Sequence, residues 1–192
     1  FAHNGQIPNF TEHRDAVLQQ ISPMYRRFIL GDTDSEAIFY LLLSNMARRF
    51  DVHRKGAPVE DVSAAIDDTV KQIHELTGMN CYERGPEDEF YLSFLLTNGH
   101  IMLAHQGGKE LYLSTYKGCC PERDLCPSFS QACEAPSDSG FVNHLIISSE
   151  PLQGENVWLE MVPGEVVGVD WRMQLHRSLL FEDSSREAIP AE

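Results

Sequence analysis

The chain has 192 residues, of which 42% are hydrophobic, so it is long enough to bury the core of one domain. Its formal net charge of −14 argues against a surface that binds nucleic acid or an anionic membrane. It contains no apolar run of membrane-spanning length, and its five cysteines, an odd number, are typical of free thiols in a reducing cytoplasm. We therefore expect a cytoplasmic protein without a nucleic-acid or membrane partner.

The first turn signal is Asn4-Gly5, within the sequence FAHNG at residues 1–5. Both residue types tolerate positive φ, and Asn-Gly after an apolar run is a strong signal for a turn. A turn here would present the Asn4 amide and the Gly5 N–H as neighbouring donors, which is what an oxyanion hole requires. A hairpin turn without any chemistry is the alternative interpretation.

Two short helices are predicted next, at residues 11–21 and 24–30, and Gly31 ends the second. Residues 31–36 then read GDTDSE, in which Thr33 and the glutamate three residues later form a capping-box pattern. Asp34 falls in the first turn of the helix that follows, where the helix dipole favours an ionised carboxylate. Such a carboxylate can bind a substrate ammonium group, or it can be one more N-terminal acid.

The helix that begins at Asp34 is expected to run to about Arg49, and its nearly continuous apolar first half predicts burial against a sheet. Another helix opens at Pro58 and ends at Gly78, with apolar residues at three- and four-residue steps. Beyond it the period changes to alternation, which predicts strands. The predicted strands are 90–96, 100–105, 110–116, 141–148, 157–162 and 165–169.

Helices followed by strands joined through tight turns indicate an antiparallel sheet in an α+β domain. We assign residues 1–181 to this domain and predict that the polar tail, residues 182–192, is disordered.

Four cysteines gather in the segment 117–140, at positions 119, 120, 126 and 133. A zinc site is one interpretation, but the spacing lacks the CxxC-like knuckle of structural zinc sites, so we favour an insertion with reduced thiols. The sequence also lacks a GxGxxG motif and a Walker loop, and we predict neither a metal nor another cofactor.

FAHNG followed by GDTDSE resembles the class-II glutamine amidotransferase domain, which belongs to the N-terminal-nucleophile family. IISSEPL at 146–152, Trp158 and VPG at 162–164 resemble one branch of that family, the γ-glutamyl hydrolases of ergothioneine synthesis and glutathione breakdown. The resemblance covers about residues 1–170. It implies a four-layer αββα sandwich, which this chain would form without its first strands.

The same resemblance implies roles for three residues. Asn4 and Gly5 would hold the oxyanion of the reaction, while Asp34, together with Gly5, would bind the γ-glutamyl group. The family's nucleophile is a cysteine at the mature N-terminus, whereas this chain begins with Phe1 and all its cysteines follow HNG and TDSE. We therefore expect a partial domain that is inactive by itself.

The activity implied by the resemblance is hydrolysis of a γ-glutamyl amide through a cysteine thioester, with a small-molecule substrate. Two alternatives remain open at this stage. The domain could bind a ligand or a partner subunit without a nucleophile, or it could be a glutaminase domain that supplies ammonia to a partner synthase.

Overall fold

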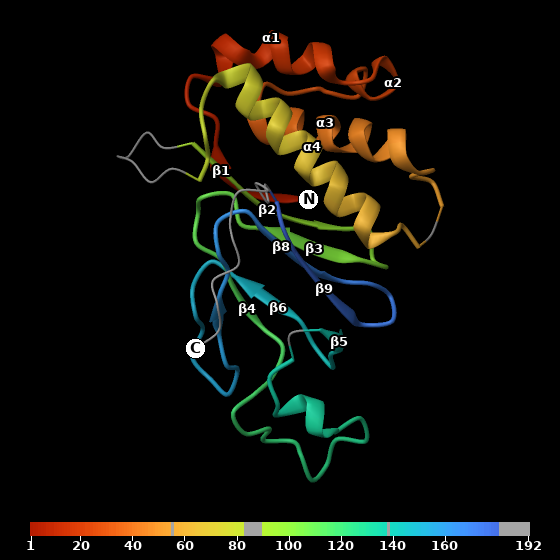
Figure 1. Ribbon diagram of the computed structural model, residues 1–192, viewed down its shortest axis with the longest axis vertical. Helices are drawn as coiled ribbons and strands as arrows, with labels where there is room; N and C mark the ends of the chain where they lie inside the picture. The colour runs from red at the N-terminus through yellow and green to blue at the C-terminus, as the bar shows by residue number, and fades with distance from the viewer. Residues whose placement is uncertain (55, 83–89, 138, 181–192) are drawn as a thin grey trace, which may run out of the picture.

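The computed structural model describes residues 1–54, 56–82, 90–137 and 139–180, so the predicted tail, 182–192, lies outside the described residues. The chain begins with a strand and continues with helices and then strands (Figure 1). The first five elements are β1 (Ala2–Gln6), α1 (Phe10–Gln20), α2 (Pro23–Arg26), α3 (Asp34–Arg49) and α4 (Val59–Thr77). The elements of the second half are β2 (Tyr91–Thr97), β3 (Met102–His105), β4 (Tyr112–Ser114), the 3₁₀ turn η1 (Gln131–Cys133), β5 (Gly140–Phe141), β6 (Ile146–Ser148), β7 (Leu159–Glu160), β8 (Glu165–Val169) and β9 (Gln174–Leu179).

The strands form two antiparallel sheets, one in the order β1-β2-β3-β8-β9-β5 and a smaller one in the order β6-β4-β7. The helices lie over one face of the larger sheet, and the smaller sheet lies on its other side (Figure 1). The predicted α+β class is thus confirmed. Of the four predicted layers, the described residues supply one helical layer and both sheets.

Alternation along β2 explains how the larger sheet serves two cores. Leu92 and Phe94 are buried in the cluster that includes α3 and α4, whereas Leu95 packs with the cluster on the opposite face. Successive strand residues point to opposite faces, so one strand can join two cores. The second cluster receives Leu111, Leu113 and Met161 from the side of the smaller sheet.

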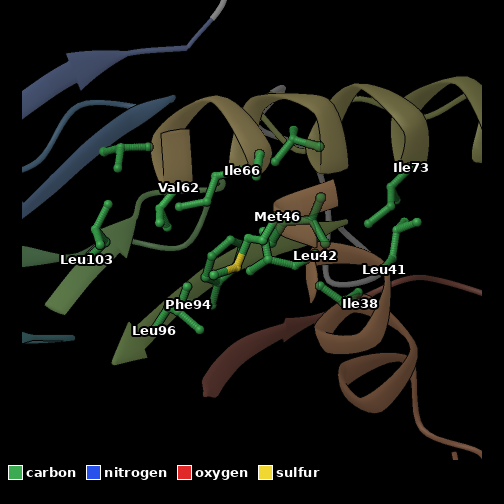
Figure 2. Packing of buried hydrophobic residues seen from close by; sticks show 14 of the residues in the cluster. Ile38, Leu41, Leu42, Met46, Val62, Ile66, Ile73, Phe94, Leu96 and Leu103 are labelled. Atoms are coloured by element: carbon green, nitrogen blue, oxygen red, sulfur yellow. The ribbon is translucent and has the colours of Figure 1, made fainter. Parts of the chain in front are cut away.

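The two long helices cover the sheet with aliphatic side chains at helical spacing (Figure 2). On α3 the buried residues include Ile38, Leu41 and Leu42, and α4 faces them with Ile66 and Ile73. Residues three and four apart lie on one side of a helix, so each helix presents a continuous apolar stripe to the sheet.

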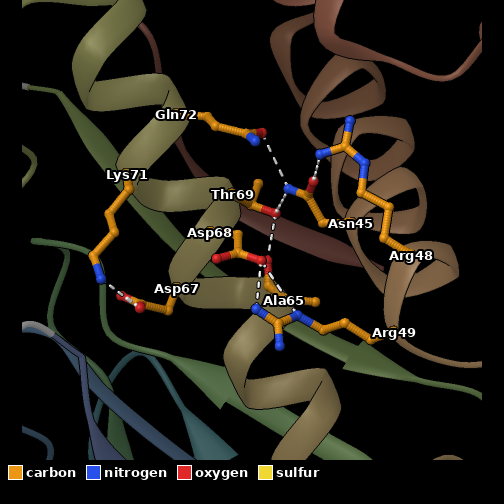
Figure 3. A network of polar contacts seen from close by, with 9 residues as sticks. All are labelled: Asn45, Arg48, Arg49, Ala65, Asp67, Asp68, Thr69, Lys71 and Gln72. Atoms are coloured by element: carbon orange, nitrogen blue, oxygen red, sulfur yellow. Dashed lines mark hydrogen bonds and ion pairs between the residues drawn. The ribbon is translucent and has the colours of Figure 1, made fainter.

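A polar network fixes the alignment of α3 against α4 (Figure 3). The buried Asn45 amide donates to Thr69 Oγ1 at 2.9 Å and to Gln72 Oε1 at 3.1 Å, and Arg48 donates to Asn45 Oδ1 at 3.0 Å. Buried amides are costly when unpaired, so these bonds favour one register between the two helices. That register also sets where the first turn of α3 lies.

Several boundaries differ from the sequence prediction. The second short helix is only α2, because residues after Arg26 leave the helix and Leu30 is 93% exposed. The predicted strand at 141–148 is divided between β5 and β6, which belong to different sheets, and β9 was not predicted at all. In the described part of the chain, no helix is both long enough and apolar enough to cross a membrane.

Substitution of Leu42 tests the importance of this helix–sheet core. Leu42 is 0% exposed, so Leu42→Ala should lower the free energy of unfolding by about 2–5 kcal/mol, measured by urea titration. The control is Leu30→Ala, which should change it by less than about 0.5 kcal/mol. Equal effects of the two substitutions would contradict the assigned core.

Candidate active site at the end of strand β1

The end of β1 is tied to the start of α3 by a carboxylate. The Ile7 N–H, just beyond β1, donates to Asp34 Oδ2 at 2.7 Å. The helix start is itself well capped, because Thr33 Oγ1 accepts from the Glu36 N–H at 3.3 Å. Glu36 in turn accepts from the Gly31 N–H at 2.8 Å. The predicted N-cap at Thr33 is confirmed, but the Glu36 carboxylate accepts from the N–H groups of Leu30 and Gly31 in place of the reciprocal bond of a capping box.

Asn4 and Gly5 lie inside β1, opposite Ser93 and Leu92 of β2, so the prediction of a turn at this dipeptide was wrong. Strand pairing with β2 overrides the local turn preference. β1 is the first strand of the sheet order, and both residues are exposed there. Donors at this position therefore face solvent rather than a filled core.

Gly5 is required by close approach and not by an unusual φ. A Cβ atom at this position would collide with the Tyr91 carbonyl oxygen on β2 and would lie 2.7 Å from His3 Nε2. Glycine is the residue that lets backbone and ring approach this closely.

Asn4 and Asp34, which are 30 positions apart in the sequence, lie on two elements that contact each other. Asp34 bonds to Ile7, and three residues of strand from Asn4 to Ile7 span about 10 Å. A second link joins the same elements, since His3 Nδ1 lies 2.9 Å from Ser35 Oγ. The structure thus places Asn4 and Gly5 on the strand that is fastened to the first turn of α3, where Asp34 lies.

The Asp34 carboxylate is partly buried and already has two backbone donors. Oδ2 accepts from Ile7, and Oδ1 accepts from the Ser35 N–H at 2.7 Å. A carboxylate offers about four lone-pair sites, so Oδ2 can accept one more bond, while Ser35 Oγ, 3.3 Å from Oδ1, can occupy the second site on that oxygen. Asp34 can therefore fasten β1 to α3 and also bind a cationic group.

The family model for class-II glutamine amidotransferases matches residues 1–176. The chain belongs to this family. No curated protein is a significant match to it.

Two solved structures show the same fold as this amidotransferase domain. One is a glutamine aminotransferase class-II domain protein from Silicibacter pomeroyi, with a TM-score of 0.56 and 20% identity, and the match covers 93% of this chain and 66% of that one. The other is a predicted glutamine amidotransferase from Pseudomonas aeruginosa PA01, with a TM-score of 0.51 and 20% identity, and the match covers 90% of this chain and 58% of that one. The domain thus spans about three fifths to two thirds of these chains.

Behind the strand, the amidotransferase domain holds a buried polar cluster that sequence reasoning missed. His105 is 0% exposed, and its Nδ1–H donates to the Leu92 carbonyl at 3.0 Å. Its Nε2 must then accept from the Tyr82 hydroxyl at 2.9 Å. Burial lowers the pKa of His105 to about 4, so the ring is neutral at physiological pH. The one feature of the sequence that could have indicated this cluster was a histidine at an inward-facing position of a predicted strand.

Cys81 lies beside this cluster and is not a plausible nucleophile. Its Sγ is 3.2 Å from His74 Nε2, which resembles a Cys–His pair. However, the thiol is fully buried, and burial raises its pKa to about 12. A thiol is a good nucleophile only as the thiolate, so Cys81 is unreactive at neutral pH.

The cysteine segment of the domain contains free thiols. Cys119 is exposed, and Cys133 Sγ accepts from the Asn143 amide at 2.8 Å. Across the described ranges, no group of three or more His, Cys, Asp or Glu side chains could hold a metal ion.

A cavity of about 720 Å³ lies elsewhere in the domain, between α4 and the β8–β9 hairpin. Its lining includes Ser63 and Ser178, whose hydroxyls are 2.8 Å apart, and neither Asn4 nor Asp34 contributes to it. The cavity and the predicted site therefore lie in different parts of the domain. We favour the end of β1, because the family motifs lie there.

His105 predicts a pH dependence of stability. The native ring titrates near pH 4 and the unfolded ring near its ordinary value of 6.5, so between these values the unfolded chain binds more protons. The free energy of unfolding should therefore fall as the pH drops from 6.5 to 4, by about 3 kcal/mol from this residue.

Urea unfolding of wild type and His105→Gln at several pH values measures this contribution. The difference in free energy of unfolding between the two proteins should change by about 3 kcal/mol between pH 6.5 and pH 4. The control is His53→Gln, at an exposed histidine, whose stability should follow that of wild type across the same pH range. Parallel curves for His105→Gln and wild type would show that the ring titrates normally.

Proposed function

We propose that this domain binds a γ-glutamyl amide and hydrolyses it through a cysteine thioester, with the cysteine on an N-terminal segment outside residues 1–192. The observation that supports the proposal is the hydrogen-bonded junction of β1, which contains Asn4 and Gly5, with the start of α3, where Asp34 lies. With five free thiols, the protein fits a reducing compartment, and we propose the cytoplasm.

The proposed chemistry is acyl transfer. The cysteine thiolate attacks the γ-carbonyl carbon, its own α-amine taking the thiol proton and passing it to the leaving amine, and water then cleaves the thioester. Negative charge develops on the carbonyl oxygen in both steps. The Asn4 amide and the Gly5 N–H would stabilise it, each by about 3 kcal/mol on the scale of measured oxyanion holes.

Asp34 would recognise the α-ammonium group of the substrate. Its Oδ2 retains acceptor capacity after bonding to Ile7, and the ammonium group offers three donors. A partly buried carboxylate binds such a cation through charge-assisted bonds and rejects an analogue that lacks it.

The cysteines of the chain do not fit the role of nucleophile. Cys81 is excluded by its burial and raised pKa. The other four belong to the segment around η1, which lies at the far end of the molecule from the helices (Figure 1). A binding or partner-subunit domain without a nucleophile is the alternative that this observation favours.

The role of Asp34 in substrate binding can be tested by steady-state kinetics. The measurement uses a form of the protein that carries the N-terminal cysteine. Asp34→Asn removes the charge, and it should lower kcat/KM for γ-glutamyl amides by about 2–4 kcal/mol. It should also erase most of the preference over amides that lack the α-amine.

The matched control is Asp32→Asn, at an acid two positions away whose side chain is 94% exposed. If Asp34→Asn prefers the amine-bearing substrate as strongly as wild type does, then Asp34 only links β1 to α3 and does not bind the ammonium group. Binding of the substrate without turnover in the complete protein would favour the nucleophile-less alternative.

Asn4→Ala tests the oxyanion assignment separately. Because this donor acts on the charge of the transition state, the substitution should lower kcat by about 100- to 1000-fold and leave KM nearly unchanged. Gln6→Ala is the control, since Gln6 is exposed on the same face of β1. A rise in KM with unchanged kcat would show that Asn4 only binds the substrate.

A further inference from the structure

The tautomer of His3 follows from its two ring contacts. Nε2 lies 3.1 Å from the Tyr91 carbonyl oxygen, which can only accept, so Nε2 carries the proton. Nδ1 of the neutral ring is then an acceptor, and Ser35 Oγ, at 2.9 Å, must donate to it. Gly5 makes this arrangement possible, because a side chain there would crowd His3 Nε2.

Ser35 lies between two groups that compete for its single hydroxyl proton. Its Oγ is 2.9 Å from His3 Nδ1 and 3.3 Å from Asp34 Oδ1. While His3 is neutral, the proton is engaged with the ring. Once His3 is protonated, Nδ1–H donates to Oγ, and the hydroxyl proton is free to turn to Asp34.

We propose that His3 and Ser35 are a positioning pair that controls how well Asp34 accepts the ammonium group of a γ-glutamyl ligand. This inference rests on the proposed function of Asp34. With neutral His3, Oδ1 holds only the Ser35 N–H and keeps a lone pair for the ligand. With protonated His3, the Ser35 hydroxyl takes that lone pair, and the positive ring competes with the ammonium group for the same carboxylate.

The surroundings of His3 favour the neutral, receptive state. Burial lowers the pKa of His3, and the Asp34 carboxylate on α3 opposes this effect only in part. β2 contributes the Tyr91 carbonyl, and Phe1, just before β1, contributes a ring whose centroid is 6.3 Å from that of His3. The pair therefore leaves Asp34 Oδ1 available to the ligand at neutral pH and makes it less available in acid.

Isothermal titration of the 192-residue chain with L-glutamine between pH 7.5 and 5 tests the inference. Wild-type affinity should fall as His3 becomes protonated, by about three- to ten-fold beyond any fall in Ser35→Ala, which is the range that one hydrogen bond gives. Ser35→Ala keeps its backbone N–H to Asp34 but cannot relay the proton. The control Ser63→Ala, at a serine bonded to Ser178, should behave as wild type.

Nuclear magnetic resonance supplies a readout that needs no ligand. The ring nitrogens of His3 should show the Nε2–H tautomer, and the Asp34 carboxyl carbon should shift more as His3 titrates in wild type than in Ser35→Ala, because only wild type adds the Ser35 hydroxyl bond to the direct effect of the ring charge. The Nδ1–H tautomer, or equal pH dependence of glutamine affinity in wild type and Ser35→Ala, would overturn the inference. Intact coupling without glutamine binding at any pH would instead overturn the proposed function of Asp34.

Discussion

The N–H of Ile7 lies just past the end of β1, and the Asp34 carboxylate accepts from it at 2.7 Å. This bond joins an edge strand to the most buried helix, so the position of the site depends on how α3 sits over the sheet. Aliphatic packing of α3 and α4 and the Asn45 network between them hold that helix in place. The position of the end of β1 thus depends on the core between the helices and the larger sheet.

Much of the fold could be predicted from the sequence, because local and tertiary preferences agree there. Thr33 caps α3 by accepting from the Glu36 N–H as their spacing predicts, and the predicted strand 165–169 has the bounds of β8. The turn at Asn4-Gly5 failed because pairing with β2 outweighs a two-residue preference. β9 was missed because its residues, QLHRSL, are exposed on much of their surface and so carry little apolar signal.

The candidate site was predicted from motif resemblance, while its supporting contacts were not. Asn4 and Asp34 each stand in a recognisable motif, so their positions could be named in advance. The role of His3 depends on a carbonyl of β2, 88 positions away, and that of Ser35 depends on the tautomer this carbonyl imposes. Such dependence arises only when the chain has folded, and a linear pattern of residue types does not encode it.

The missing side chain at Gly5 has a consequence for the genetics of this position. The atom that a Cβ would strike first belongs to the main chain of Tyr91, and main-chain atoms are the same whatever residue is encoded there. A replacement of Gly5 therefore has no suppressor at position 91, and shrinking His3 would relieve only the lesser conflict. Randomised libraries that vary positions 5 and 91 jointly should recover only glycine at position 5.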